Sequence, residues 1–320
     1  MAEAWLSLSR EDRAEALEVA AAQTGRAPHL LEKDVWVVWV LSVIDQSPLA
    51  NKLTFKGGTS LSKAYKIIDR FSEDIDLTCD IRAIAPDLLR DGNPIPETAS
   101  QAKKISDHVR ARLPQWVEGE VLPILRSALE RDGLQSSLSL AGLDREKLLL
   151  AYAPIKMGMG YTKSTIQLEF GGRATGEPHQ RRAVACDMAA ERTFWEKATA
   201  AHVYCRQGRL RGDRYSRHWY DLAAMAESGH AQAAISDQAL ARDVALHKSM
   251  FFAEKDAAHQ PIDYKTAVGG HIQIIPEGGA MAALEKDYAA MLEDGLLSTH
   301  QPRFDSIMAA CAHLQNLINR

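Results

Sequence analysis

The chain has 320 residues, of which 46% are hydrophobic and 25% charged, a composition typical of a globular protein with one large domain or two ordinary ones. The net charge of −4 excludes a generally basic surface, so contact with nucleic acid would need a local patch. Four scattered cysteines without C-x-x-C spacing predict neither a zinc site nor a disulfide framework. The sequence has no signal-peptide pattern and no apolar run near 18 residues, so we expect a cytoplasmic protein without membrane contact.

Two helices are expected in the first part of the chain. Residues 8–24 have an amphipathic pattern, with Ser9 in position to cap the first turn. Residues 30–44 form a strongly apolar segment that contains Trp36 and Trp39. This segment predicts a buried helix packed against a sheet rather than a membrane span.

The stretch from residue 52 to residue 78 carries the strongest indication of function. Residues 53–55 are strand-forming, and Gly57-Gly58 marks a turn in which glycine allows positive φ and close backbone approach. Ser60 is expected at the N-cap of a helix that extends to Ile68. Exposed amide groups at such a glycine turn predict a phosphate-binding site.

Two carboxylates follow this helix one residue apart. In Asp74-Ile75-Asp76-Leu77 the acidic residues alternate with apolar ones, so on a strand both carboxylates face one side and the apolar residues face the core. Neighbouring carboxylates repel each other unless a cation lies between them, and Mg²⁺ is commonly held by one or two carboxylates together with substrate phosphates. A glycine turn alone can be purely structural, and a lone D-x-D pair can be merely solvated. Their combination predicts a nucleotide-transfer site. The sequence contains no Walker-type phosphate loop, so that motif does not provide an alternative explanation for phosphate binding.

These motifs resemble those of known nucleotidyltransferases. Gly57-Gly58-Thr59-Ser60 followed by Asp74-x-Asp76 is similar to the first motif of the polymerase-β-type enzymes. The longer string FKGGTSLSKAYKIIDRFSEDIDL resembles the AbiEii family of nucleotidyltransferase toxins, which are toxin components of type IV toxin–antitoxin systems. The resemblance implies Mg²⁺, with Mn²⁺ as an alternative, at Asp74 and Asp76, and a nucleoside triphosphate as substrate. It also implies phosphate contacts from six residues, namely Lys56, Gly57, Gly58, Thr59, Ser60 and Lys63.

The middle of the chain predicts a loop, a long helix and then further strands. Residues 83–100 are rich in proline and glycine, and residues 101–132 predict a helix that Pro114 and Pro123 kink or split. Strands are expected at residues 153–160, 164–170 and 183–188.

The second of these strands offers a third carboxylate. Polymerase-β-type enzymes carry one on a later strand, where it positions or deprotonates the attacking hydroxyl group. Alternation in residues 165–170 places Glu169 on the polar face, and Glu169 is our candidate for this role. A solvated glutamate is the alternative interpretation, and Asp187 is the second candidate for the role.

Beyond Met188 the pattern is helical. The strings ERTFWEK and SRHWYDL resemble later motifs of AbiEii proteins, and this resemblance implies that Lys197 and Asp221 are functional. Lys197 would contact nucleotide phosphate and Asp221 would orient it. The alternative is an ordinary buried ion pair, either Lys197 with Asp221 or Arg217 with Asp221.

One local basic patch is present in this acidic chain. Its arginines suit phosphate oxygens, so the patch would bind the RNA backbone or the triphosphate, although a flexible surface loop is an alternative. The patch consists of Arg206, Arg209, Arg211, Arg214 and Arg217. Residues 236–320 predict further amphipathic helices, with a strand or hairpin at 270–275.

The sequence therefore predicts an α/β (α+β) fold, with a small mixed β-sheet nucleotidyltransferase core and N-terminal helices in residues 1–190 and a helical lobe in residues 191–320. The resemblance implies Mg²⁺-dependent transfer of a nucleoside monophosphate onto an RNA acceptor, with the tRNA 3′ end preferred, leading to growth arrest, and a cognate antitoxin encoded nearby. Transfer onto a protein hydroxyl and an inactive nucleotide- or partner-binding module are the alternatives.

Overall fold

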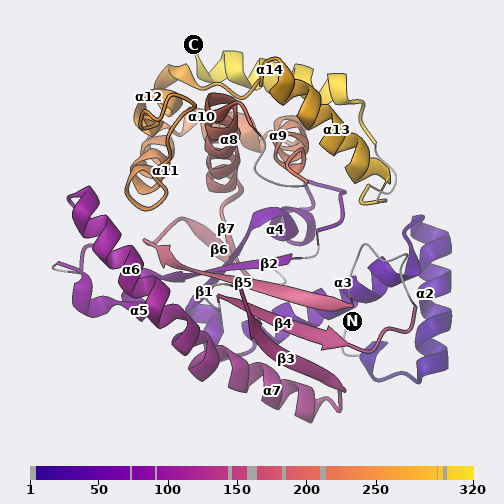
Figure 1. Ribbon diagram of the computed structural model, residues 1–320. Coiled ribbons are helices and arrows are strands. Elements are labelled where there is room, and N and C mark those ends of the chain that lie inside the picture. Colours follow the sequence, from indigo (N-terminus) through magenta and orange to yellow (C-terminus); the bar gives the residue numbers. More distant parts are fainter. Residues whose placement is uncertain are drawn as a thin grey trace. The chain divides into compact units, whose positions relative to one another are not determined.

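The computed structural model describes residues 5–72, 74–90, 92–142, 146–156, 164–181, 185–209, 214–293, 295–297 and 301–320. The chain forms two compact units, which we call the sheet unit and the helical unit (Figure 1). The sheet unit comprises Met1–Ala64, Phe71–Pro94 and Lys104–Met188. The helical unit comprises Tyr65–Arg70, Ile95–Lys103 and Ala189–Arg320.

The sheet unit is built on one mixed sheet, which in the described residues has seven strands in the order β3-β4-β5-β2-β1-β7-β6. β1 runs antiparallel to β2 and parallel to β7, and β2 runs parallel to β5. The strands are β1 (Leu53–Lys56), β2 (Asp74–Asp80), β3 (Ser136–Ala141), β4 (Lys147–Tyr152), β5 (Thr165–Ala174), β6 (His179–Arg181) and β7 (Cys186–Met188). The predicted α/β class with a mixed sheet is confirmed.

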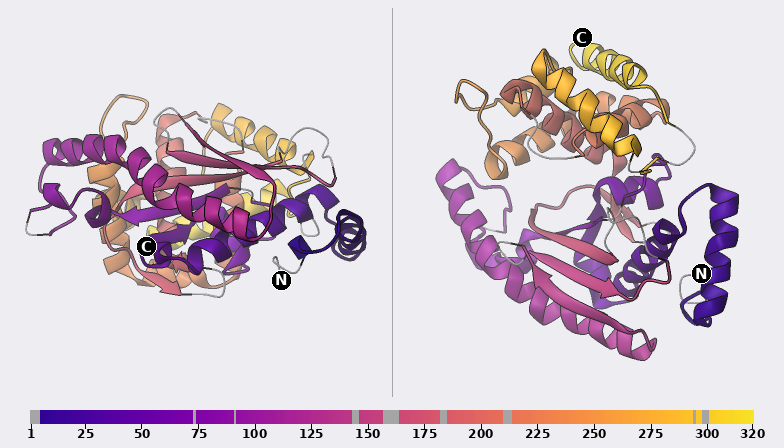
Figure 2. Two further views of the ribbon diagram at one scale, coloured as in Figure 1. Left: turned by 90° about the horizontal axis from the view of Figure 1, so that it is seen from below. Right: turned by 45° about the vertical axis from the view of Figure 1, so that its right-hand side comes forward.

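Helices of the same unit cover the sheet. Ser9 accepts a hydrogen bond from the Asp12 backbone N–H at 3.1 Å, so the predicted cap of the first helix is confirmed. Figure 2 shows α6 and α7, in magenta, as a nearly continuous rod that is interrupted by a π-helical turn at Val117–Val121. The helices are α2 (Arg10–Thr24), α3 (Pro28–Asp45), α4 (Gly57–Lys63), α5 (Ile81–Ile84), α6 (Ala99–Trp116) and α7 (Leu122–Arg131), and the first residues of α6 belong to the helical unit.

Several predicted elements differ from those observed. The helix after β1 begins at Gly57 and ends at Lys63, so Ser60 lies inside it and the predicted extension to Ile68 is wrong. β3 and β4 were not predicted. A strand was predicted at residues 153–160, but residues 153–156 form no strand, and residues 157–160 lie outside the described part of the chain. Residues 270–275 form no strand.

Buried tryptophan side chains connect the elements of the helical unit. The Trp195 indole N–H donates to the Ala234 carbonyl at 3.0 Å, and the Trp219 indole N–H donates to the Ile274 carbonyl at 2.6 Å. The helices are α8 (Ala190–Gln207), α9 (Arg217–Glu227), α10 (His230–Ser236), α11 (Gln238–Phe251), α12 (Tyr264–Thr266), α13 (Gly279–Glu293) and α14 (Phe304–Ile318). Among the described helices, none combines the length and apolar character needed to cross a bilayer. A domain boundary at residue 190 remains a prediction.

Candidate active site

The junction between β1 and α4 brings backbone and carboxylate together. The antiparallel register of β1 and β2 places Lys56 opposite Asp76. Gly57 follows with a φ of +78°, and a Cβ atom at this position would lie 2.2 Å from Asp76 Oδ2. Only glycine adopts this backbone conformation readily and leaves room for the carboxylate. The predicted positive φ and close approach at Gly57 are therefore confirmed.

The two aspartates of β2 lie on one face of the strand. Asp74 and Asp76 are half-buried, whereas Ile75 and Leu77 between and beyond them are 0% and 1% exposed. This alternation confirms that the two carboxylates share a face while the apolar side chains form the core.

The neighbouring strand β5 adds Glu169 to the same face. In the parallel pairing of β2 with β5, Asp74 lies beside Gln167 and Asp76 lies beside Glu169. The Gln167 amide Nε2 donates to Glu169 Oε1 at 2.7 Å and lies 3.2 Å from Asp74 Oδ1. The sheet thus holds three carboxylates side by side, and one amide connects two of them.

Lys147 of β4 is a further member of this cluster that the sequence did not reveal, because β4 itself was not predicted. Its Nζ lies 2.5 Å from Glu169 Oε1, in a pair that the antiparallel β4–β5 register places directly opposite each other. Burial alone would lower the pKa of Lys147, but the hydrogen bond and charge of Glu169 outweigh burial and raise it. Glu169 therefore faces a permanent positive charge.

The carboxylates fit a magnesium site of a limited kind. Among the described residues, no cluster of three or more acidic, histidine or cysteine side chains surrounds one possible metal position. Asp74 and Asp76 alone still match Mg²⁺, because this ion takes its remaining ligands from substrate phosphates and water. Glu169 is hydrogen-bonded to Lys147 and Gln167, so Asp74, Asp76 and Glu169 do not form a preassembled metal cage in the described part of the chain.

The hydroxyl groups of Thr59 and Ser60 in α4 form hydrogen bonds inside the protein, and the phosphate contacts expected of the two residues stay predictions. Both residues are at most 1% exposed. Thr59 Oγ1 lies 2.5 Å from the Asp74 carbonyl oxygen and 2.8 Å from Ser72 Oγ, and Ser60 Oγ donates to Asp187 Oδ1 at 2.9 Å. These bonds hold α4 against β2 and β7, and they make Asp187 a buried support of α4.

The two lysines around the glycine turn have different surroundings. Lys63, at the end of α4, forms an ion pair with Asp34 of α3, and its phosphate contact stays a prediction. Lys56 lies at the end of β1 beside Asp76 and is half-buried, which keeps it at the carboxylate cluster.

The helical unit contains a buried charge cluster around Asp221, which is 0% exposed. Arg70 Nε and Nη2 donate to its two oxygens at 2.7 Å each, and Lys197 Nζ lies 2.7 Å from Oδ2. The expected pairing of Lys197 with Asp221 is confirmed, whereas the fork that binds Asp221 comes from Arg70 rather than from Arg217. Arg70 was not predicted as a site residue, although it opens the string RFSEDIDL.

This cluster carries two cations for one anion. Burial alone would raise the pKa of Asp221, but the charges of Arg70 and Lys197 outweigh it and hold the pKa well below its ordinary value. Burial and the nearby charges of Lys197 and Arg217 hold the pKa of His218 well below 6.5, so this imidazole is neutral at pH 7. The local excess of positive charge suits an anionic ligand.

The structure includes four of the five arginines of the predicted basic patch, and Arg211 lies outside the described residues. Arg206 and Arg209 are exposed near the end of α8, and Arg206 Nη2 lies 3.1 Å from Asp256 Oδ2. Arg214 has a φ of +62°, and its backbone N–H donates to Asp287 Oδ1 at 2.6 Å. Arg217 begins α9.

Comparisons with known proteins give one matching family and several similar solved structures. A family model described as nucleotidyl transferase AbiEii toxin, type IV toxin–antitoxin system, matches residues 39–310. No curated protein matches the chain. Similar solved structures include JHP933 from Helicobacter pylori, with 14% identity, a TM-score of 0.48 and coverage of 92% of this chain and 93% of that one. They also include the nucleotidyltransferase toxin MenT4 from Mycobacterium tuberculosis H37Rv, with 17% identity, a TM-score of 0.39 and coverage of 98% of both chains.

Proposed function

Since the chain belongs to the AbiEii family of nucleotidyltransferase toxins, we propose that it moves a nucleoside monophosphate from a triphosphate onto the 3′ end of an RNA, with tRNA as the preferred acceptor. The observation that carries this proposal is the contact of Gly57 with Asp76, on the sheet face that also presents Asp74 and Glu169. Backbone amides and carboxylates are thereby brought together at one point, as a bound triphosphate requires.

In this proposal the carboxylates of Asp74 and Asp76 hold Mg²⁺. When bound, the metal neutralises the charge that develops as pyrophosphate leaves. The backbone N–H groups of Gly57 and Gly58 bind phosphate oxygens, and Lys56 adds a positive charge beside Asp76. Binding of metal and triphosphate also removes the mutual repulsion of the two carboxylates.

Glu169 acts on the acceptor rather than on the metal. The acceptor hydroxyl oxygen bonds to the α-phosphorus, the bond from that phosphorus to the bridging oxygen breaks, and pyrophosphate departs. Glu169 accepts the hydroxyl proton. Lys147 and Gln167 hold the carboxylate in position before the hydroxyl arrives.

Lys197 supplies positive charge to the nucleotide, and the neighbouring charges fix its position. Its ammonium group forms an ion pair with Asp221, and Asp221 forms a second ion pair with Arg70. We therefore assign Asp221 and Arg70 to positioning. The exposed Arg206 and Arg209 favour an RNA acceptor over a protein hydroxyl, because arginine forks match phosphate oxygens. A cognate antitoxin and a cytoplasmic location belong to the same proposal.

Transfer of label tests this function. The purified chain is mixed with Mg²⁺, each α-labelled nucleoside triphosphate in turn, and total RNA or cell lysate. We expect label on RNA of tRNA size, and Asp76→Asn should abolish it, because the metal loses a charged ligand. Asp80→Asn is the matched control, since Asp80 lies on the same strand outside the cluster and asparagine can still cap α5.

The other outcomes separate the alternatives. Label on protein alone moves the acceptor to a protein hydroxyl. Absence of label with every nucleotide, while nucleotide still raises the melting temperature, leaves an inactive binding module. Label that survives Asp76→Asn contradicts the assigned metal site.

A further inference from the structure

The sheet face that carries Asp74 and Asp76 also carries fixed positive charges. The β1–β2 pairing places Lys56 opposite Asp76, and the β2–β5 pairing places Asp76 beside Glu169. The β4–β5 pairing then places Lys147 opposite Glu169. Two lysines and two carboxylates therefore form one row, in which each carboxylate has a lysine as its outer neighbour. The lysines offset much of the negative charge that would otherwise attract more than one divalent cation.

The Lys147 ammonium group is held at Glu169. Its Nζ lies 2.5 Å from Glu169 Oε1, and the Lys147 side chain is only 29% exposed. Burial alone would lower the pKa of Lys147, but the carboxylates of Glu169, Asp74 and Glu146 outweigh burial and raise it. The amine is therefore charged at pH 7, and its charge acts on more than one carboxylate of the sheet unit.

A second side chain connects Glu169 with Asp74. The Gln167 amide Nε2 donates to Glu169 Oε1 at 2.7 Å and lies 3.2 Å from Asp74 Oδ1. The same Glu169 oxygen thus accepts hydrogen bonds from an amide and from the Lys147 ammonium group. A carboxylate oxygen has about two lone-pair sites, so this one is fully used inside the protein. The amide takes part in the contact that a shared metal ion would otherwise make.

Nucleotide transfer is often assisted by two divalent cations. They lie about 3.5–4 Å apart, and one stabilises the attacking oxygen while the other stabilises the leaving oxygen. In this chain Asp74 and Asp76 are the ligands proposed for one ion, and Glu169 is the carboxylate that a second ion would need. Among the described residues, no group of three acidic, histidine or cysteine side chains surrounds a possible metal position. The place of the second ion is therefore the place where Lys147 meets Glu169.

We propose that Lys147 takes the place of a second divalent cation, so that the site binds a single metal ion with its triphosphate. The inference rests on the proposed function, because it takes the reaction to be nucleotide transfer at Asp74 and Asp76. These two aspartates hold the one ion on the side of the leaving pyrophosphate. Lys147 supplies the positive charge on the acceptor side, and it is a positioning residue because it acts through Glu169.

The test counts bound ions by equilibrium dialysis of the full chain against Mn²⁺ and a non-hydrolysable nucleoside triphosphate. The result is the number of Mn²⁺ ions held for each triphosphate held. We expect about one for the native chain and for Lys147→Arg, which keeps the charge, and about two for Lys147→Met, which keeps the stem and releases Glu169. Lys147→Gln should behave as Lys147→Met does. Combining Lys147→Met with Glu169→Gln should restore the native ratio, because the second ion loses its carboxylate.

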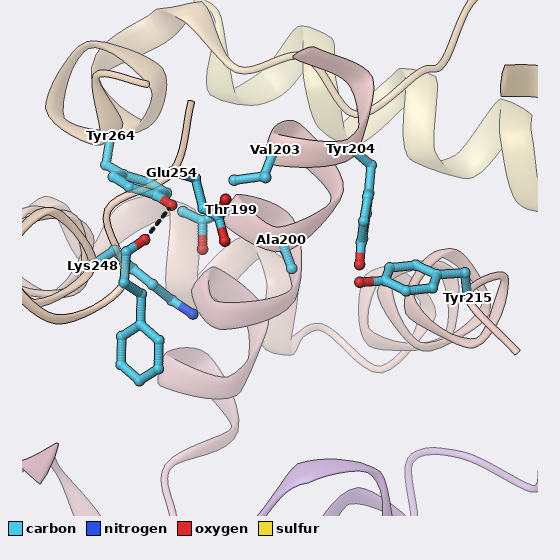
Figure 3. Close-up of a pocket in the computed structure, with 9 residues that line it drawn as sticks. Thr199, Ala200, Val203, Tyr204, Tyr215, Lys248, Glu254 and Tyr264 are labelled. Carbon is cyan, nitrogen blue, oxygen red and sulfur yellow. Dashed lines mark hydrogen bonds between the residues drawn. The ribbon is translucent and has the colours of Figure 1, made fainter. Parts of the chain in front are cut away.

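Two variants outside the site are controls. Lys52→Met removes a lysine from another ion pair of the sheet unit, in which Lys52 Nζ lies 2.7 Å from Glu120 Oε2. Glu254→Gln removes the one acidic side chain among the residues that line the pocket between α8 and α11 in the helical unit, where Lys248 also lies (Figure 3). Neither variant should change the ratio, because neither removes a charge from the row on the sheet.

The dependence of label transfer on Mg²⁺ is a second measurement. Lys147→Met should transfer label roughly 10- to 100-fold more slowly than the native chain at low Mg²⁺ concentration, and high Mg²⁺ concentration should restore most of the rate. The restoration is expected because a second ion then supplies the charge of the lysine. A loss of rate that Mg²⁺ does not repair contradicts the inference, since a merely structural role for Lys147 would give that result.

The failure of this inference and that of the proposed function are distinguishable. Two ions for each triphosphate in the native chain, or an unchanged ratio in folded Lys147→Met and Lys147→Gln, overturn the role of Lys147. The proposed function stands in both cases if the native chain still transfers label to RNA. A native chain that holds no ion with the triphosphate and transfers no label overturns both.

Discussion

At the scale of single residues, Asp76 occupies space that a side chain at position 57 would otherwise fill. The overlap would be severe, because a Cβ atom at 2.2 Å from Asp76 Oδ2 is far inside contact distance. The carboxylate cannot keep its place beside any residue larger than glycine. The glycine is therefore required by the geometry of the metal ligand as well as by its φ of +78°.

Gly57→Ala should cost both activity and stability. We expect label transfer to fall at least 100-fold, because the carboxylate must move by an ångström or more. The left-handed backbone adds a destabilisation of about 1–2 kcal/mol, which urea denaturation measures. Gly25→Ala is the control, because Gly25 has a φ of +69° with no atom within 4 Å of its missing Cβ. Equal loss of transfer in the two variants would contradict the role given to the overlap.

At the scale of elements, the sequence predicted the strands that carry the site and missed those beside it. β2 and β5 have strict alternation of polar and apolar residues, and the structure places them in one sheet. β3 reads SSLSLA, which is short and rich in serine, and its residues are partly exposed, so its signal is weak. Because β4 was missed with it, the partnership of Lys147 with Glu169 could not be predicted.

The periodicity of polar and apolar residues also could not predict contacts between residues far apart in the sequence. The hydrogen bonds of the Thr59 and Ser60 hydroxyl groups were not predicted, because their partners, Asp74 and Asp187, lie 15 and 127 residues away. Arg70 reaches Asp221 across 151 residues. A sequence pattern shows which face of an element is polar, but the partner on that face depends on the tertiary fold.

The contact of Arg70 with α9 predicts a large effect of removing the Asp221 charge. Asp221→Asn leaves two buried cations without their anion, so the free energy of unfolding should fall by about 3–5 kcal/mol. Asp305→Asn is the control, because its pair with Arg303 is 81–85% exposed and worth at most about 1 kcal/mol. A double-mutant cycle with Arg70→Met should show strong coupling, and additive effects would refute the ion pair.

At the scale of the whole molecule, the chain contributes to its two units discontinuously. Residues 65–70 and 95–103 belong to the helical unit, although the residues on either side of each segment belong to the sheet unit. Composition and periodicity cannot reveal such a division, because both segments are short and are assigned only by their contacts. The boundary at residue 190 therefore remains a prediction, and it takes no account of these two segments.

Stability of the molecule should fall in mild acid. Burial lowers the pKa of His202 to about 4, and its Nδ1 accepts the Gln273 backbone N–H at 2.9 Å, which requires an unprotonated ring nitrogen. The unfolded chain takes up this proton near pH 6.5 and the folded chain does not. Stability is thus complete above pH 6.5 and decreases toward pH 4, by roughly 3 kcal/mol from this residue.

Urea denaturation at pH 7.5, 6 and 5 measures this dependence. His202→Gln retains an acceptor for the Gln273 N–H and should flatten the decrease, whereas replacement of the exposed His259 by Gln should not. The same slope in the native chain and His202→Gln would show that another group is responsible. His218, with its pKa also lowered by burial, contributes in the same direction.

The close approach of Gly57 to Asp76 also has a genetic consequence. All four glycine codons begin with two guanines, so any single base change in the first two positions removes the glycine, and all but the change of GGA to the stop codon TGA put another residue in its place. Cells under selection to escape this toxin would therefore gain loss-of-function alleles at codon 57 through many single steps. Such alleles would leave the rest of the reading frame intact, and they would be recovered there far more often than at codon 25.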